Sequence, residues 1–439
     1  VVCALAGAMI VTPKRAAADE PPANPAAAKA ATVDDRWYVL QLMGSNAGYV
    51  HTVERTDTET ITTSSILKIA LKREALKIEI SVESEFVETL AGKPVRMKVT
   101  QALGTAPVVE ETVFGEGEWT ITSTQNGRET KRTRKPIAGE WLAMAAAERY
   151  VEAELKKGSK EIVVRTIDPQ DGGSAITVTR KVGAEANVEV LGRTVPAVTW
   201  TSTVDKYPGI KSKEFVDAGG KTVRSEVNMG GMKMVQIMAD KELALLESKA
   251  PELLLSMMIH VKPGIDNPRD ARKLAYVVSV DEDEIPVLPS AGAQRFSRID
   301  AKSGRIVVDL DSNSAVTDAD KANVEFTTPS KMIGSDDPKI IELTAQALGD
   351  AGKGDKAELT ATQKAERLRA FVRDFITKKD MSVGFATASE VCRTKTGDCT
   401  EHGVLLAALL RAAGIPSRVC TGVVYVSQME VAGGKTMKD

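Results

Sequence analysis

The residue of this chain best suited to covalent chemistry is Cys399, because a thiolate is a strong nucleophile and this cysteine directly precedes an apolar segment. Within KTGDCTEHGVLLAALLRAAGIPSR (395–418), residues 404–410 are apolar on every side, which predicts a buried helix that ends at Gly414 and Pro416. Free N–H groups and the dipole at the start of such a helix stabilise a thiolate, and the same groups can donate to an oxyanion.

The neighbours of Cys399 both favour and oppose a thiolate at the helix start. Gly397 permits a tight turn into the helix, whereas Asp398 and Glu401 add negative charge that opposes a thiolate. The alternative interpretation of Cys399 is a small buried thiol at a helix start.

A base for this thiol is hard to find, since the chain has three histidines and none follows residue 402. His402 lies one turn beyond Cys399 on the same helix, so its side chain is expected to run along the helix surface and to have a structural role with a hydrogen-bonding partner still to be found. His51 belongs to a strand pattern and His260 to an apolar run, which favours packing or surface roles for both.

The stretch GDCTEHGVLLAALLRAAGIPSRVCTGVVYV (397–426) resembles the cysteine segment of the transglutaminase-like superfamily, relatives of papain-like proteases, over about residues 336–426. The resemblance implies a bacterial exported member in which Cys399 is the nucleophile of a Cys-His-Asp triad. It also treats His402 as part of the motif and not as the base. We expect the catalytic His and Asp to lie beyond Asp439, so that the present stretch is inactive by itself.

The other cysteines are expected to have structural roles. Cys392 falls in a short helix and Cys420 in a strand, which predicts two packing residues, with a disulfide between them as the alternative. No CxxC and no pair of Cys or His residues with zinc spacing occurs, so no metal and no cofactor is expected.

Several helices are predicted around Cys399. Asp337, Pro338 and Gly349 indicate the N-cap, first position and end of one helix, and Thr360 with Gln363 forms a capping-box signature for the next. Apolar spacing carries that second helix to about Lys378. A short helix at about 386–393 and a strand at 417–426 complete the expected core, residues 335–439.

The residues before this core follow strand patterns. The alternation in LKIEISVESEF (76–86) predicts a half-buried strand, and EFVDAGGKTVRSEV (214–227) predicts a hairpin. Similar alternation recurs at 37–44, 95–103, 161–167, 174–182 and 194–204. With one helix at about 139–156, these segments predict a large antiparallel β-rich domain at 35–245, followed by a smaller β-rich segment at 246–334.

Length and charge limit the remaining classes. The 439 residues predict more than one core, and a net charge of -2 argues against a nucleic-acid partner. The apolar run at 1–11 is too short to span a bilayer, and Ala16 and Ala18 form an A-x-A pattern, so residues 1–18 are expected to be a partial signal peptide and 19–34 a linker. An Ala-rich tail or anchor is the alternative.

These observations together predict an α+β protein: a large antiparallel β-rich N-terminal domain followed by a papain-like, transglutaminase-like core that is incomplete at its C-terminus. The expected function is an exported, periplasmic or secreted, cysteine enzyme in which Cys399 attacks an amide of a protein or peptide substrate, with no membrane span in the mature chain. A non-catalytic envelope scaffold is the second hypothesis, and a hydrolase using His260 as base is the third. The sequence decides neither the substrate, nor water against amine as acceptor, nor the oligomeric state.

Overall fold

The structure is a computed structural model that describes residues 32–438, apart from 74–75, 105, 126, 208–209, 230–231, 252–257, 260, 262, 282–283, 313–322, 350–358, 380–384 and 432–434. The chain divides into two compact units, Val1–Met257 and Met258–Asp439. The expected signal peptide and most of the expected linker lie outside the described residues. Within the described part of the chain, no helix has the length and apolar character needed to span a membrane.

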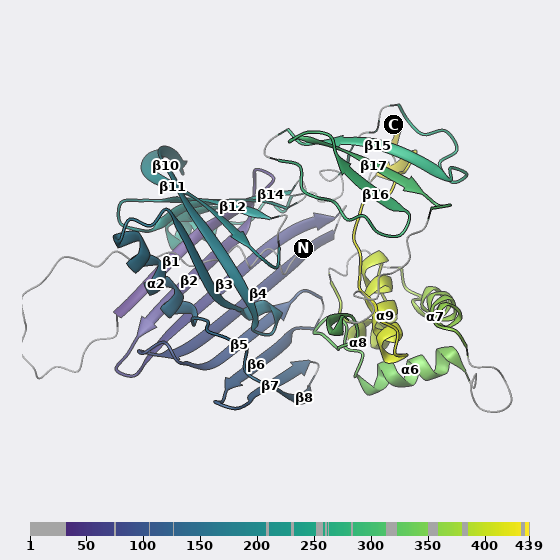
Figure 1. The fold of residues 1–439 in the computed structure, drawn as a ribbon, viewed down its shortest axis with the longest axis horizontal. Coiled ribbons are helices and arrows are strands. Elements are labelled where there is room, and N and C mark those ends of the chain that lie inside the picture. Colours follow the sequence, from purple (N-terminus) through teal and green to yellow (C-terminus); the bar gives the residue numbers. More distant parts are fainter. Residues whose placement is uncertain are drawn as a thin grey trace, which may run out of the picture. The chain divides into compact units, whose positions relative to one another are not determined.

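The first unit is built on one antiparallel sheet of fourteen strands (Figure 1). Strands β1–β8 follow one another as a meander, β9–β14 form a second meander, and β14 pairs with β1 to join the two. The strands are β1 Thr32–Leu42, β2 Ser45–Thr56, β3 Thr60–Arg73, β4 Leu76–Thr89, β5 Pro94–Ala102, β6 Val108–Phe114, β7 Trp119–Gln125, β8 Arg128–Arg134, β9 Glu161–Asp168, β10 Ser174–Val190, β11 Arg193–Val204, β12 Lys211–Val216, β13 Thr222–Met229 and β14 Met232–Ala239.

The period-two pattern of the sequence is confirmed in this sheet. In β4, the side chains of Ile78, Ile80 and Val82 are buried, whereas Lys77 and Glu79 are exposed. The predicted hairpin is formed by β12 and β13, whose turn is closed by Asp217 N–H donating to the Lys221 carbonyl and Lys221 N–H donating to the Asp217 carboxylate. The β-rich character of this part of the chain could therefore be inferred from alternation alone.

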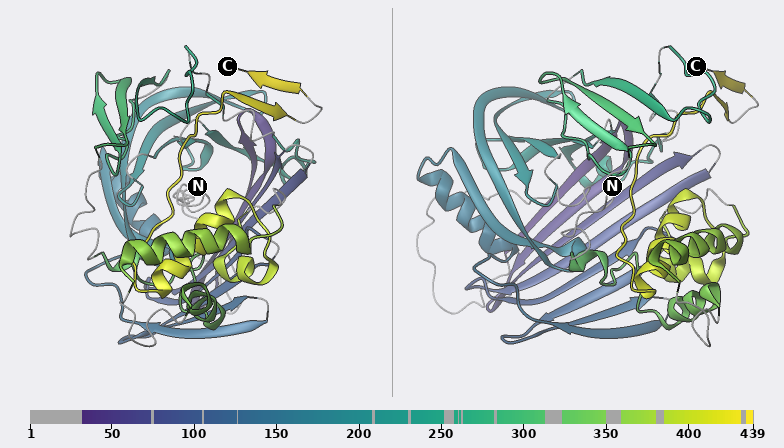
Figure 2. Two further views of the ribbon diagram at one scale, coloured as in Figure 1. Left: turned by 90° about the vertical axis from the view of Figure 1, so that its right-hand side faces the viewer. Right: turned by 45° about the vertical axis from the view of Figure 1, so that its right-hand side comes forward.

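Helix α2 (Met144–Lys156) packs against β9 and also against β3 and β4. The sheet itself is strongly curved (Figure 2). The predicted start at residue 139 is wrong by five residues. The reason is Arg165 on β9, whose guanidinium donates to the carbonyls of Ala138 and Glu140 and whose own carbonyl accepts from Leu142 N–H. These bonds hold the segment before α2 in a non-helical conformation.

The start of α2 is capped by a residue from the sheet. The N-cap residue Ala143 has no side-chain acceptor, and the wholly buried carboxylate of Glu88 on β4 accepts from the N–H groups of Ala145 and Ala146, at 2.9 Å each. Arg149 lies beside the same carboxylate. Burial raises the pKa of Glu88, and the two N–H groups and Arg149 oppose that rise.

We expect Glu88→Ala to lower the free energy of unfolding of the first unit by about 2 kcal/mol, because two buried N–H groups lose their acceptor. Denaturant titration followed by tryptophan fluorescence measures this, since all four tryptophans lie in this unit. Glu83→Ala, an exposed position on the same strand, is the matched control. Equal losses in the two variants would contradict the capping role of Glu88.

The second unit contains a small sheet, a helical group and a terminal hairpin (Figure 1). The small sheet has the order β15-β17-β16 and falls in the segment 246–334, where a smaller β-rich part is predicted. The elements are β15 Lys273–Ser279, β16 Gln294–Arg298, β17 Ser303–Asp309, η2 Val324–Phe326, α6 Pro338–Leu348, α7 Ala361–Phe375, α8 Ala388–Thr394, α9 Cys399–Ala412, β18 Gln428–Val431 and β19 Lys435–Lys438; a shorter helix, α3 Lys241–Ala244, and the turn η1 Pro169–Asp171 belong to the first unit.

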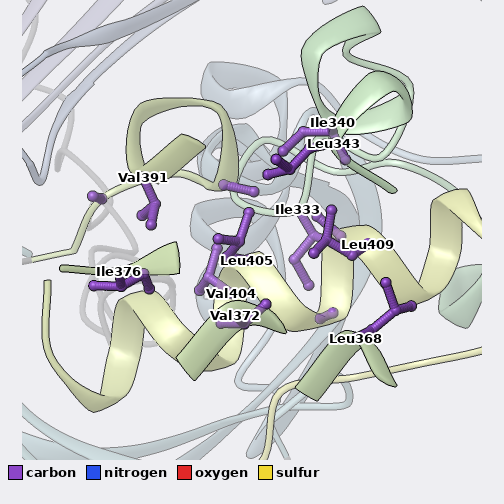
Figure 3. Packing of buried hydrophobic residues seen from close by; sticks show 14 residues of the cluster. Ile333, Ile340, Leu343, Leu368, Val372, Ile376, Val391, Val404, Leu405 and Leu409 are labelled. Carbon is purple, nitrogen blue, oxygen red and sulfur yellow. The ribbon is translucent and has the colours of Figure 1, made fainter. Parts of the chain in front are cut away.

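The core of the helical group forms around α9 (Figure 3). Leu405 and Leu409 of α9 are fully buried and are surrounded by apolar side chains from α6, α7 and α8, among them Ile340, Leu368 and Val391. The prediction that the apolar stretch 404–410 forms a buried helix is thus confirmed.

The helix boundaries follow the capping signals closely. Asp337 caps α6, Pro338 is its first residue, and Thr360 with Gln363 forms the expected capping box of α7. However, α7 ends at Phe375, three residues before the predicted Lys378, because Lys378 instead forms a bridge with the chain just before α9.

The strand predicted at 417–426 is not formed. No described strand forms a ladder with this segment, although Ser417 N–H donates to the carbonyl of Phe326 at 2.9 Å, and the side chains of Val423 and Val424 are 86% and 84% exposed. Alternation of β-branched residues predicts a conformation, whereas a strand also requires a neighbouring strand to supply its hydrogen bonds.

Candidate active site

The first residue of α9 is Cys399, and its side chain is exposed. Asp398 is the N-cap, and its carboxylate accepts from the N–H groups of Thr400 and Glu401. Helix α9 therefore starts at a fixed place, with the thiol at its outer end. Among the described residues, the sulfur of Cys399 makes no hydrogen bond.

The capping geometry changes one expectation about the free N–H groups of this helix start. We expected them to be available to an oxyanion, but those of Thr400 and Glu401 already donate to Asp398, and that of His402 donates to the Asp398 carbonyl. A single residue thus satisfies three of the donors at this helix end, and these three are not available to a substrate.

Glu401 is the least expected member of the site, since it is a carboxyl group with no exposed surface. One oxygen accepts from Asp398 N–H at 3.0 Å, which completes a capping box, and the other accepts from Ala386 N–H at 3.1 Å, just before α8. Burial raises the pKa of Glu401 to about 7, the nearby negative charge of Asp398 adds to the rise, and the two N–H bonds oppose it.

The raised pKa of Glu401 reduces the negative charge that this residue was expected to add beside the thiol. The sequence did carry a signal for its real role. Asp398 and Glu401 have the D-x-x-E spacing of a capping box, the same signature that identified Thr360 and Gln363.

Gly397 lies directly against the Glu401 side chain. A Cβ on Gly397 would come within 2.2 Å of Glu401 Cβ and 2.3 Å of its Cγ, and the φ of Gly397 is +152°. Its N–H donates to the carbonyl of Lys378, while Lys378 N–H donates to Lys395, so the chain before Cys399 is anchored to the segment after α7. The expected tight turn at Gly397 is thus a close approach between backbone and side chain.

His402 has the structural role expected of it, and its partners can now be named. Its Nδ1–H donates to the carbonyl of Asp398, which leaves Nε2 to accept from Lys379 Nζ at 2.8 Å. This assignment of the tautomer follows from the partners, because a carbonyl can only accept and an ammonium can only donate. Both ring nitrogens are engaged away from Cys399.

The other two histidines differ in what the structure says of them. Nε2 of His51 forms a hydrogen bond with Asp35 Oδ1 at 2.9 Å, and the His51 ring stacks on Trp37 with ring centroids 3.8 Å apart. His51 is therefore a packing residue of the first unit. His260 lies outside the described residues.

Cys392, Cys399 and Cys420 are all free thiols. The structure therefore contradicts the alternative of a disulfide between Cys392 and Cys420. Cys392 is half-buried against the helical core, as predicted for a packing residue. Burial raises the pKa of its thiol. Cys420 is exposed, so its predicted packing role is wrong, because the strand in which it was placed has no partner.

The turn after α9 is held by side-chain bonds within the R-A-A-G-I-P-S run. Arg411 donates to the carbonyl of Ser417 through Nε and Nη2, at 3.0 and 2.8 Å, and Ser417 Oγ donates to Ala407 at 2.9 Å. The two most specific stretches of the sequence, GDCTEH and LRAAGIPSR, therefore fix the two ends of one helix.

Comparison with known families agrees with this geometry. Residues 350–435 match the transglutaminase-like superfamily. The second unit of the chain thus carries a transglutaminase-like core whose match includes α7, α8 and α9, and Cys399 lies inside it. The suspected resemblance is confirmed, as is the α+β class: a large antiparallel sheet in the N-terminal part, with helices near the C-terminus.

The other two comparisons give no information about function. No curated protein matches the sequence. The crystal structure of a beta-barrel-like protein of a domain of unknown function from Brucella abortus is similar at a TM-score of 0.35 and 13% identity, covering 47% of this chain and 95% of that one. At this score the similarity carries no conclusion about fold or function.

Proposed function

We propose that the chain belongs to an exported cysteine enzyme that acts on amide bonds of proteins or peptides. The observation that carries the proposal is the placement of Cys399: an exposed thiol at the first position of the buried helix α9, inside a transglutaminase-like core. The positive end of the helix dipole and an exposed position favour a reactive thiolate.

The proposed reaction has two halves. The Cys399 thiolate attacks the amide carbonyl carbon, a C–S bond forms, and the carbonyl oxygen takes the electron pair as an oxyanion. The oxyanion then collapses, the C–N bond breaks, and the amine leaves with a proton supplied by the protonated base, giving a thioester. Water or an amine attacks the thioester carbonyl carbon and gives a proton to the base, a C–O or C–N bond forms, the C–S bond breaks, and the thiolate returns as an acid or a new amide is released. Water makes the enzyme a peptidase or amidase, and an amine makes it a transglutaminase.

The base in this proposal is a histidine outside the described residues. His402 is engaged with Asp398 and Lys379, and His51 with Asp35 and Trp37.

A second candidate function is a non-catalytic envelope scaffold. The observation that favours it is the same engagement of His402 and His51, which leaves Cys399 with no described hydrogen-bond partner to take up its proton. In this case the large sheet of the first unit would bind a polymer or protein, and the thiol would be unused.

Export is proposed on the N-terminal sequence alone. The apolar run at 1–11 followed by Ala16 and Ala18 has the order of an h-region and a cleavage site, which supports a place in the periplasm or outside the cell.

The test uses the protein as its gene encodes it, with fluorescent casein for hydrolysis and a fluorescent primary amine plus casein for acyl transfer. We expect Cys399→Ser to lower whichever activity is present by at least about 100-fold, because a hydroxyl is a far weaker nucleophile than a thiolate in this setting. Cys420→Ser, which changes another exposed thiol, is the control and should keep wild-type activity. Undiminished turnover in Cys399→Ser would refute the mechanism, and a wild-type protein without either activity would favour the scaffold.

A further inference from the structure

The position of Cys399 depends on one side chain that is not part of the proposed reaction. Glu401 lies two residues further along α9, has no exposed surface, and uses its two oxygens for two different segments. The bond to Asp398 N–H fixes where α9 begins, and the bond to Ala386 N–H fixes that start against the chain leading into α8.

The backbone before the thiol is fitted to this carboxyl group. Gly397 leaves no room for a Cβ, since the Cβ and Cγ of Glu401 occupy that space. Movement of Glu401 would therefore displace both Gly397 and the N-cap, and Cys399 is the next residue after them.

We propose that Glu401 is the positioning residue of Cys399, and that loss of its proton lowers the reactivity of the thiol. The first part follows from the two backbone bonds and the close approach of Gly397. The second follows from charge, because the Glu401 carboxylate lies two residues from Cys399 at the same helix start and has the same sign as the thiolate. This inference deepens the proposed function, but the reactivity of the thiol can be measured without a substrate.

Ionisation of other groups near Glu401 can also change the reactivity of the Cys399 thiol with pH. The charged and titratable residues of α8, α9 and the neighbouring segments include Asp398, His402 and Arg411 of α9 and its N-cap, Glu390, Cys392 and Arg393 of α8, and Lys378, Lys379 and Lys395 in the segments beside them. Of these, His402 is the one imidazole. A test of Glu401 must therefore separate it from His402.

The measurement is the alkylation rate of Cys399 by iodoacetamide between pH 5.5 and 9, read by peptide mass spectrometry and divided by the rate of Cys420 in the same molecule. Burial raises the pKa of Glu401 to about 7, so the wild-type ratio should bend downward near pH 7 as the carboxylate forms. Glu401→Gln should remove the bend, whereas His402→Gln and the exposed Glu342→Gln should keep it. A bend that survives in Glu401→Gln, or that disappears in His402→Gln, would overturn the proposal.

Positioning has its own readout in hydrogen exchange. In Glu401→Gln an amide NH₂ faces one of the two backbone N–H donors, so peptides containing Ala386 and Asp398 should exchange at least about 10-fold faster while those of α7 stay unchanged. Unchanged exchange at both places would contradict the positioning role.

Should Glu401→Gln not fold, the wild-type and His402→Gln profiles still decide, because absence of a bend near pH 7 in both would overturn the inference. None of these readouts requires that Cys399 process an amide, so a failure of the proposed function and a failure of this inference are distinguishable.

Discussion

Replacement of Gly397 by alanine is expected to destabilise the helical group of the second unit by about 3 kcal/mol. The new Cβ would overlap the Cβ and Cγ of Glu401, and Glu401 cannot retreat without breaking its bonds to Asp398 and Ala386. The positive φ of Gly397 adds backbone strain for any residue with a side chain.

Hydrogen exchange of peptides from α9 measures this loss directly, and tryptophan fluorescence of the first unit serves as an internal reference, because the second unit has no tryptophan. Gly414→Ala is the matched control. Gly414 also has a positive φ, +77°, but nothing lies within 4 Å of its Cβ direction, so only the backbone cost of about 1 kcal/mol is expected. Similar losses for the two glycines would show that the contact with Glu401 is unimportant.

The second large effect is expected at Leu405, in the middle of α9. Its side chain is fully buried among residues of the surrounding helices, and the removal of three carbons leaves a cavity that rigid neighbours cannot fill (Figure 3). Leu405→Ala should lower the free energy of unfolding of the helical group by about 3–4 kcal/mol.

The same exchange experiment measures this change across α6, α7 and α9 together, since the cluster joins them. Ile341→Ala provides the control: it removes a similar amount of side chain from α6, one residue after the buried Ile340, at an exposed position. We expect a change below about 0.5 kcal/mol there. A small effect at Leu405 would mean that α9 is not the centre of the core.

Much of the fold could be predicted from local patterns. Alternation located strands of the first unit such as β4, β5 and β9, and capping residues such as Asp337 and Thr360 placed helix starts to the residue. These predictions succeeded because the signals act within a few residues. The start of α2 and the segment 417–426 were wrong for the opposite reason, since the first is set by Arg165 from another strand and the second lacks a pairing partner.

The candidate site shows the same division. The sequence identified Cys399 as the first residue of a buried helix and the structural role of His402, but the lysine bound to His402 is 23 residues away in the chain and could not be named. Burial of Glu401 was also missed. A carboxylate next to a thiol suggests charge, and only the three-dimensional surroundings reveal that this one is shielded from water.

Asp398 shows that the residues of the GDCTEH motif depend on one another for their structure. Its carboxylate caps the helix, its carbonyl holds His402, and its N–H holds Glu401, so every polar group of this residue is committed. The effects of single substitutions at 397, 398, 401 and 402 should consequently not add, because each change alters the background for the others. A mutational scan that treats these positions as independent will count the same structural loss several times.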